Sequence, residues 1–93
     1  MEIRFYLDPE SGIPHIWGHG VDEDEVRDVL QGPIEDRDGY DGARVAIGRT
    51  RNGRDLRVVY VIDTEPLSIF VITAYPLVGK ALKAFKRRQR KRR

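Results

Sequence analysis

Four side chains in this sequence have the charges and proton affinities that chemistry on a phosphate group requires: His19, Arg54, Arg57 and Tyr75. The forked guanidinium of arginine binds two phosphate oxygens and stays charged at neutral pH. Histidine exchanges protons near neutral pH, because its unperturbed pKa is about 6.5. Tyrosine can donate a proton or stack on a nucleic-acid base. We therefore take these four residues as the catalytic candidates.

Further cations are candidates for binding phosphate or RNA. Arg49 and Arg51 lie on or beside a predicted turn, and Lys80 and Lys83 lie in the C-terminal segment. The charge is segregated along the chain: residues 1–65 contain 15 acids and 8 basic residues, whereas residues 66–93 contain 9 basic residues and no acid. Such asymmetry indicates a polyanion, an anionic surface or an acidic protein as the partner.

The candidates also have structural interpretations. Arg54 and Arg57 could be solvated charges of a hairpin, paired with Asp55 or Asp63. His19 could cap a helical turn or make a structural hydrogen bond. These alternatives stay open at the level of the sequence.

Two further interpretations concern histidine and tyrosine. His15 and His19 are four residues apart and could share a metal ion, but no third ligand is evident. We therefore expect no metal and no other cofactor. Tyr60 lies within an apolar strand and is expected to pack in the core, whereas Tyr75 precedes a proline at a strand end and is expected to be accessible.

The rest of the chain is organised around residues 55–77. Two runs of β-branched and aromatic residues, 56–62 and 69–72, predict a pair of central strands. The Asp63-Thr64-Glu65-Pro66 sequence between them predicts a hairpin turn. Further strands are expected at residues 2–7, 34–38 and 44–48, and Asn52-Gly53 is a strong turn signal before the first central strand.

Helices are expected before and after this sheet. Residues 11–20 predict a short helix with Trp17 as its main core residue. Residues 21–32 predict a clearer helix, with Asp22 as N-cap and Glu25 completing a capping box. A basic helix should follow Pro76, and residues 86–93 should form a frayed helix end or a disordered tail, because they contain no apolar residue.

This order predicts an α+β fold. Two N-terminal helices should pack on one face of a small antiparallel sheet of three to five strands, followed by the C-terminal basic helix. We expect one domain over residues 1–85 and a basic tail over residues 86–93. The chain has no cysteine, no apolar run of about 20 residues that could span a membrane, and no signal-peptide pattern. These features predict a soluble cytoplasmic protein.

Several local motifs then suggest a family. An early strand ends in Asp8-Pro9-Glu10, and His19-Gly20-Val21 precedes an acidic helix start. The hairpin reads Gly48-Arg49-Thr50 and then GRDLRVVY over residues 53–60, and the last strand reads VITAY over residues 71–75. In this order and spacing the sequence resembles the BrnT-like branch of the RelE superfamily of bacterial type II toxins.

That resemblance implies a RelE-like fold and a small, metal-independent endoribonuclease that is inhibited by an antitoxin protein and acts on RNA, including RNA on the ribosome. Gly18 stands where these proteins typically have lysine, and Tyr75 where they usually have arginine. Two other functions fit the same residues: a non-catalytic nucleic-acid-binding or ribosome-associated module, and an interaction domain whose basic tail binds an acidic partner. The amphipathic basic segment could also lie on a membrane surface.

Overall fold

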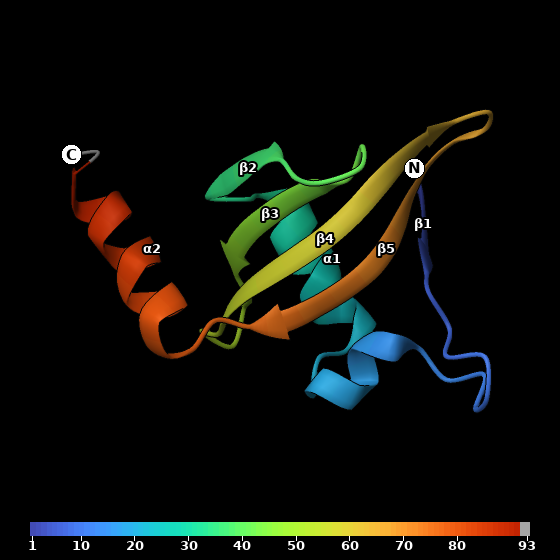
Figure 1. Ribbon diagram of the computed structural model, residues 1–93, viewed down its shortest axis with the longest axis horizontal. Helices are drawn as coiled ribbons and strands as arrows, with labels where there is room; N and C mark the ends of the chain where they lie inside the picture. The colour runs from blue at the N-terminus through green and yellow to red at the C-terminus, as the bar shows by residue number, and fades with distance from the viewer. Residues whose placement is uncertain (92–93) are drawn as a thin grey trace.

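The computed structural model describes residues 1–91 and has an α+β fold (Figure 1). Five strands form one sheet: β1 (Glu2–Phe5), β2 (Glu35–Asp38), β3 (Arg44–Arg49), β4 (Asp55–Thr64) and β5 (Leu67–Pro76). The helical elements are a 3₁₀ helix, η1 (His15–His19), and two α-helices, α1 (Glu23–Gln31) and α2 (Gly79–Lys91). Each predicted strand is thus present, and two of the three predicted helical segments, residues 21–32 and the segment after Pro76, are α-helices. In this part of the chain no helix is long and apolar enough to cross a bilayer.

The sheet is mixed, which differs from the antiparallel sheet expected from the sequence. Its order is β1-β5-β4-β3-β2, with antiparallel pairing from β2 to β5 and parallel pairing between β1 and β5. The direction of β1 follows from where the chain goes next. β1 leads through a Leu7–Pro14 bridge into η1, and η1 contacts β5, with His19 beside Tyr75 near the C-terminal end of that strand. Both strands therefore run toward η1.

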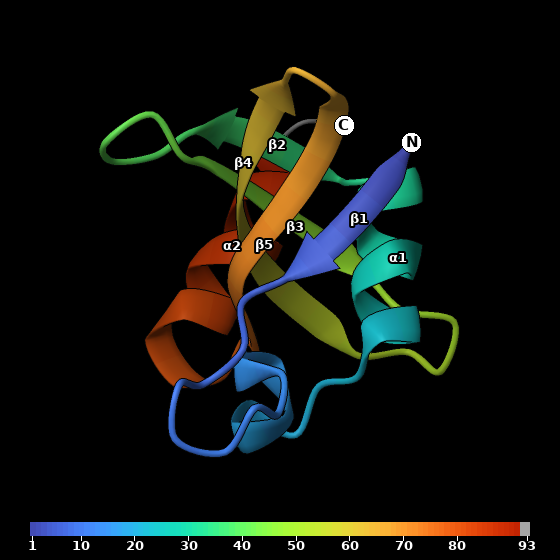
Figure 2. The ribbon, with the colours of Figure 1, turned by 90° about the vertical axis from the view of Figure 1, so that its right-hand side faces the viewer.

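The two α-helices lie on opposite faces of the sheet, as Figure 2 shows. Of the two N-terminal helices expected on one face, only α1 is an α-helix; the other segment is the 3₁₀ helix η1, whose Ile16 is buried in the same core as α1. Helix α1 packs on the face that we call the covered face, where Val26 and Val29 are fully buried. The core there also contains one buried residue from η1, one from the loop before α1 and several from the central strands: Ile16, Val21, Ala46, Leu56, Val58, Tyr60, Val71 and Ala74.

Helix α1 begins as its sequence predicted. The Asp22 carboxylate accepts a hydrogen bond from the Glu25 backbone N–H at 2.8 Å, and the Glu25 carboxylate accepts one from the Asp22 N–H at 3.2 Å. This capping box satisfies two N–H groups that have no partner within the helix. The helix approaches β3 at Gly48, where an added Cβ would lie 3.1 Å from a methyl of Val29. The small residue therefore allows the close packing of α1 on the sheet.

The segment before α1 differs from the expected helix. Residues His15–His19 form a 3₁₀ helix, which Gly20 ends in a left-handed conformation with φ of 73°. Trp17 was expected in the core, but 51% of its surface is exposed, and Ile16 is buried instead. A 3₁₀ helix turns about 120° per residue rather than 100°, so Trp17 points away from the direction of Ile16. Its indole N–H donates to the Glu23 carboxylate at 2.6 Å.

Helix α2 continues through the expected boundary at residue 85. Phe85 packs with Ile47 and Leu77 in a second apolar cluster, which Leu82 borders. Three residues further on, the Arg88 guanidinium binds the Glu35 carboxylate through two bonds of 2.9 Å, and Gln89 adds a third. Residues 86–91 are therefore helical and attached to β2, unlike the expected frayed or disordered end. Residues 92–93 of that predicted tail lie outside the described residues.

Candidate active site on the open sheet face

The second face of the sheet, which we call the open face, carries the strongest candidate site. Successive side chains of a strand point to opposite faces. On β4, therefore, Leu56 and Val58 face the core, whereas Arg57 and Val59 point to the open face. Arg57 pairs directly with Tyr75 on β5, so these two side chains are neighbours on that face. The sheet thus brings together two catalytic candidates that are 18 positions apart in the sequence.

Arg57 is a half-buried cation without an internal partner. Its Nε is buried and makes no hydrogen bond, and no carboxylate among residues 1–91 forms an ion pair with its guanidinium. A buried donor that lacks an acceptor costs free energy, and the cost is larger for a charged group. An anion bound at the accessible end of the guanidinium would supply the missing counter-charge. The interpretation of Arg57 as a paired hairpin charge is therefore wrong.

His19 completes this group. Its ring lies edge-on to the Tyr75 ring, with the centroids 6.0 Å apart. The side chain is exposed, and its ring nitrogens make no hydrogen bond to any described residue. The structural roles considered for His19, a helix cap or a fixed hydrogen bond, thus have no counterpart among residues 1–91. We call His19, Arg57 and Tyr75 the open-face cluster.

A row of rings extends from this cluster toward β1. The rings of His15 and His19 are 5.1 Å apart, those of Tyr6 and His15 are 6.0 Å apart, and Phe70 lies 6.5 Å from Tyr6. The Nδ1 atom of His15 lies 2.9 Å from a carboxylate oxygen of Asp8, which orients the imidazole. Across residues 1–91, no group of three His, Asp or Glu side chains has a metal-binding arrangement.

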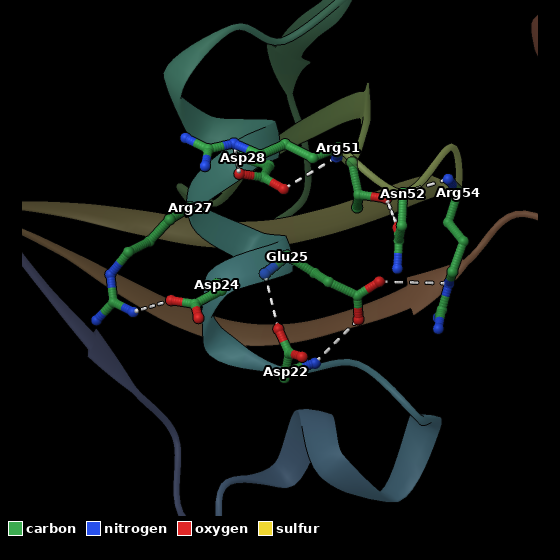
Figure 3. A network of polar contacts seen from close by, with 9 residues as sticks. Asp22, Asp24, Glu25, Arg27, Asp28, Arg51, Asn52 and Arg54 are labelled. Carbon is green, nitrogen blue, oxygen red and sulfur yellow. Dashed lines mark hydrogen bonds and ion pairs between the residues drawn. The ribbon is translucent and has the colours of Figure 1, made fainter.

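Arg54, the fourth catalytic candidate, belongs to a different network (Figure 3). Its guanidinium donates to the Gly20 carbonyl at 3.1 Å and lies 3.5 Å from the Glu25 carboxylate. Glu25 is buried and is also part of the capping box of α1. The structure therefore uses Arg54 to neutralise a buried carboxylate, and we no longer assign it to phosphate.

The cations proposed to bind phosphate also divide by their partners. Arg49 binds Asp55, which raises the pKa of its guanidinium through the side-chain hydrogen bond and the negative charge. Arg51 pairs with Asp28 of α1 at 3.3 Å, although its side chain is largely exposed. Lys80 and Lys83 are exposed on α2 and form no ion pair with a described residue. Of these four cations, all within residues 1–91, the two lysines are thus the ones without an ion pair.

Tyr60 is a core residue, as predicted. It is 4% exposed, and its hydroxyl lies 2.9 and 3.0 Å from the two oxygens of the Asp36 carboxylate. Burial raises the pKa of Tyr60, and the bond to Asp36 raises it further. The neutral phenol therefore serves to connect β4 to β2.

Sequence analysis did not include Tyr6 and His15 in the site, although both border the cluster. Tyr6 lies one residue after β1 and touches Phe70, whose partner in the register is Val61 of the open face. In the strand predicted for residues 2–7, side-chain alternation places Tyr6 on the face opposite to Ile3 and Phe5. Its place beside β5 was not predictable, because the pairing of β1 with β5 joins distant parts of the chain.

Residues 18–76 match the family described as "Domain of unknown function (DUF4258)". This chain belongs to that family. The matched region includes the whole open-face cluster, whereas α2 with Lys80 and Lys83 lies outside it. Comparison with curated proteins and with solved structures gave no match.

Proposed function

We propose that this member of the DUF4258 family is an endoribonuclease whose active site is the open-face cluster. The observation that carries the proposal is Arg57, a half-buried arginine without an internal partner, directly beside Tyr75. His19, whose imidazole can accept or donate a proton, lies edge-on to the same tyrosine. This combination offers a phosphate ligand and two proton-transfer groups within one accessible surface.

The proposed reaction is transfer of the phosphoryl group within RNA. The 2′-oxygen attacks the adjacent phosphorus, the bond from phosphorus to the 5′-oxygen breaks, and a 2′,3′-cyclic phosphate and a 5′-hydroxyl form. Neutral His19 accepts the 2′-hydroxyl proton, and the Tyr75 hydroxyl gives a proton to the leaving 5′-oxygen. Arg57 binds the two non-bridging oxygens and stabilises their developing charge. We propose that the reaction requires no metal ion, because Arg57 provides this positive charge.

The resemblance to BrnT-like toxins supports a biological setting for this chemistry. We propose that the protein is the toxin of a toxin–antitoxin pair, and that the antitoxin blocks the open face. The two departures from the BrnT-like pattern are Gly18 and Tyr75, which both border His19. A Cβ added to Gly18 meets no atom within 4 Å, so Gly18→Lys can restore the family's cation without a clash. This variant should cleave RNA faster than the wild type.

The direct test is incubation of the purified full chain with single-stranded RNA, with and without EDTA. We expect cleavage that EDTA does not reduce, products with a 2′,3′-cyclic phosphate, and no cleavage of a matched oligonucleotide with 2′-deoxyribose at every position. Cleavage of the deoxy oligonucleotide would contradict attack by the 2′-oxygen. Inhibition by EDTA would contradict a reaction independent of metal.

A second candidate function is RNA binding without cleavage, and the row of rings favours it. Tyr6, His15, His19 and Tyr75 form successive ring contacts beside the cation Arg57, an arrangement on which unpaired bases can stack. Stable binding of intact RNA, with no product after prolonged incubation of either wild type or Gly18→Lys, would establish this function in place of the first.

A further inference from the structure

The open face also contains a pocket that neither the open-face cluster nor helix α2 fills. Its volume is about 550 Å³, and it lies between β3, β4 and the loop over residues 39–43. Its floor consists of aliphatic side chains: Val45, Val59, Val61 and Ile72. Arg57 forms part of its wall. The cation of the proposed active site thus also borders an apolar cavity.

The pocket has the volume and the mainly apolar lining of a small-ligand site. Such sites measure roughly 300–1,000 Å³ and combine an apolar lining with a few polar groups that orient the ligand. Here the β2–β3 loop adds Tyr40, which is 92% exposed and lines the pocket. The Gly39 backbone N–H donates to the Ala43 carbonyl at 2.8 Å, which closes this loop.

The charges around the pocket are separated, and this separation orients a ligand. Arg57 lies on the strand side, whereas Asp38 and Asp41 lie on the loop side. Asp38 is paired with Arg44 at 2.8 Å, and Arg37, which also lines the pocket, is paired with Glu35 at 3.4 Å. An anionic group is therefore favoured beside Arg57 and disfavoured under the loop. Hydrogen-bond donors, such as the amino groups of bases, are favoured near the two carboxylates.

We propose that this pocket binds the base of one unpaired nucleotide, with the phosphate of that nucleotide on Arg57. An inorganic anion would leave the aliphatic floor uncovered, and a purely apolar molecule would leave the Arg57 guanidinium, which lines the pocket, without a counter-ion. A nucleotide supplies both a flat, largely apolar base and a phosphate. The inference deepens the proposed function, since it relies on Arg57 as the phosphate ligand, and it identifies the substrate as RNA that is single-stranded at the cleavage position.

The test compares adenosine 5′-monophosphate with ribose 5-phosphate, which has the same phosphate but no base. We expect the full chain to bind the nucleotide about tenfold more tightly, because stacking and burial of one base contribute an effect of this order. In NMR titrations the nucleotide should shift the methyl signals of Val59, Val61 and Ile72. Equal affinity for the two compounds, absence of nucleotide binding, or shifts confined to α2 would overturn the inference.

Two variants locate the binding. Val59→Phe places a ring in the pocket and should abolish the preference for the nucleotide, whereas Ile62→Phe, an exposed position on the same strand but outside the pocket, should keep it. If Val59→Phe fails to fold, Tyr40→Ala tests the same point, because Tyr40 is almost fully exposed; it should weaken nucleotide binding about threefold. An unchanged preference in the folded pocket variants would overturn the inference.

The nucleotide-binding test and the RNA-cleavage test can fail independently of each other. If the protein cleaves RNA but binds the two compounds equally, the pocket inference fails and the nuclease stands. If it prefers the nucleotide but cleaves no RNA, the pocket stands and the nuclease fails.

Discussion

An arginine lies on each side of the sheet, and the two have opposite surroundings: Arg54 is paired within residues 1–91 of the protein, whereas Arg57 is not. On the side of α1, Arg54 contacts the Gly20 carbonyl and the buried Glu25 carboxylate. On the open face, Arg57 has no ion pair with any residue from 1 to 91 and a buried Nε without an acceptor. Arg54 lies immediately before β4 and next to α1, whereas Arg57 lies within β4 and points to the open face. The comparison teaches that the environment, rather than the local sequence, makes one arginine structural and leaves the other available to a ligand.

The largest expected effect comes from removing the cation of the open face. Arg57→Ala should lower RNA cleavage by about 100-fold, as the loss of one preorganised group that stabilises transition-state charge typically does. Its melting temperature should stay close to that of the wild type, because Arg57 has no internal partner to lose. Arg57→Lys should recover only part of the rate, since lysine keeps the charge without the fork. A folded Arg57→Ala protein with full activity would contradict the proposed site.

The proton-transfer residues should show a smaller effect with a different signature. His19→Ala and Tyr75→Phe should each lower the single-turnover cleavage rate by at least about tenfold. General acid–base groups typically contribute about 10²- to 10⁴-fold. RNA affinity should change little in His19→Ala, because the side chain is proposed to act in the chemical step. Filter binding and single-turnover kinetics on the same samples separate the two quantities. Weaker binding at an unchanged maximal rate would assign His19 to RNA binding instead.

The arginine on the other side should affect stability instead of activity. Arg54→Ala leaves the buried carboxylate of Glu25 without its cation, and we expect a loss of about 1–2 kcal/mol in the free energy of unfolding. Arg51→Ala is the matched control: its guanidinium also pairs with α1, but the side chain is largely exposed, so the loss should be below about 0.5 kcal/mol. Urea titrations measure both.

Cleavage by these two variants then sharpens the comparison. Each should cleave RNA at the wild-type rate under conditions where it is fully folded. A large loss of rate in folded Arg54→Ala would return this residue to the active site.

The smallest effect concerns the attachment of α2. Arg88 of α2 donates two hydrogen bonds to the Glu35 carboxylate, and these bonds lower the pKa of Glu35 below the ordinary value of 4.5. A carboxylate with a lowered pKa stabilises the fold above its unfolded pKa, and this contribution disappears as the pH falls through the folded value. Glu35→Gln should therefore cost about 1 kcal/mol at pH 7, since the pair is partly exposed. The difference from wild type should shrink as the pH falls below 4.5 and disappear once the pH is below the lowered pKa of Glu35. A difference in stability independent of pH would contradict this role for the charge.

Much of the local structure follows from the sequence alone. The apolar runs and turn residues predicted β4, β5 and the hairpins, and the Asp22–Glu25 spacing predicted the capping box of α1. These features depend on residues close together in the chain, so their physical causes are visible in short windows. The sequence also identified each residue of the open-face cluster as a candidate, because their chemistry is a property of residue type.

The tertiary structure decided how those pieces and candidates are grouped. The 3₁₀ geometry of η1 exposed Trp17, and the pairing of β1 with β5 made the sheet mixed. Packing of α1 gave Arg54 a buried carboxylate as its partner, whereas Arg57 faces a pocket. Each result depends on contacts between residues far apart in the sequence, whose free energies are set by burial and by the groups that packing brings together. Residue type and local periodicity identified both Arg54 and Arg57 as possible phosphate ligands. Only the arrangement of the helices around the sheet showed that, among residues 1–91, Arg54 has an internal partner and Arg57 has none.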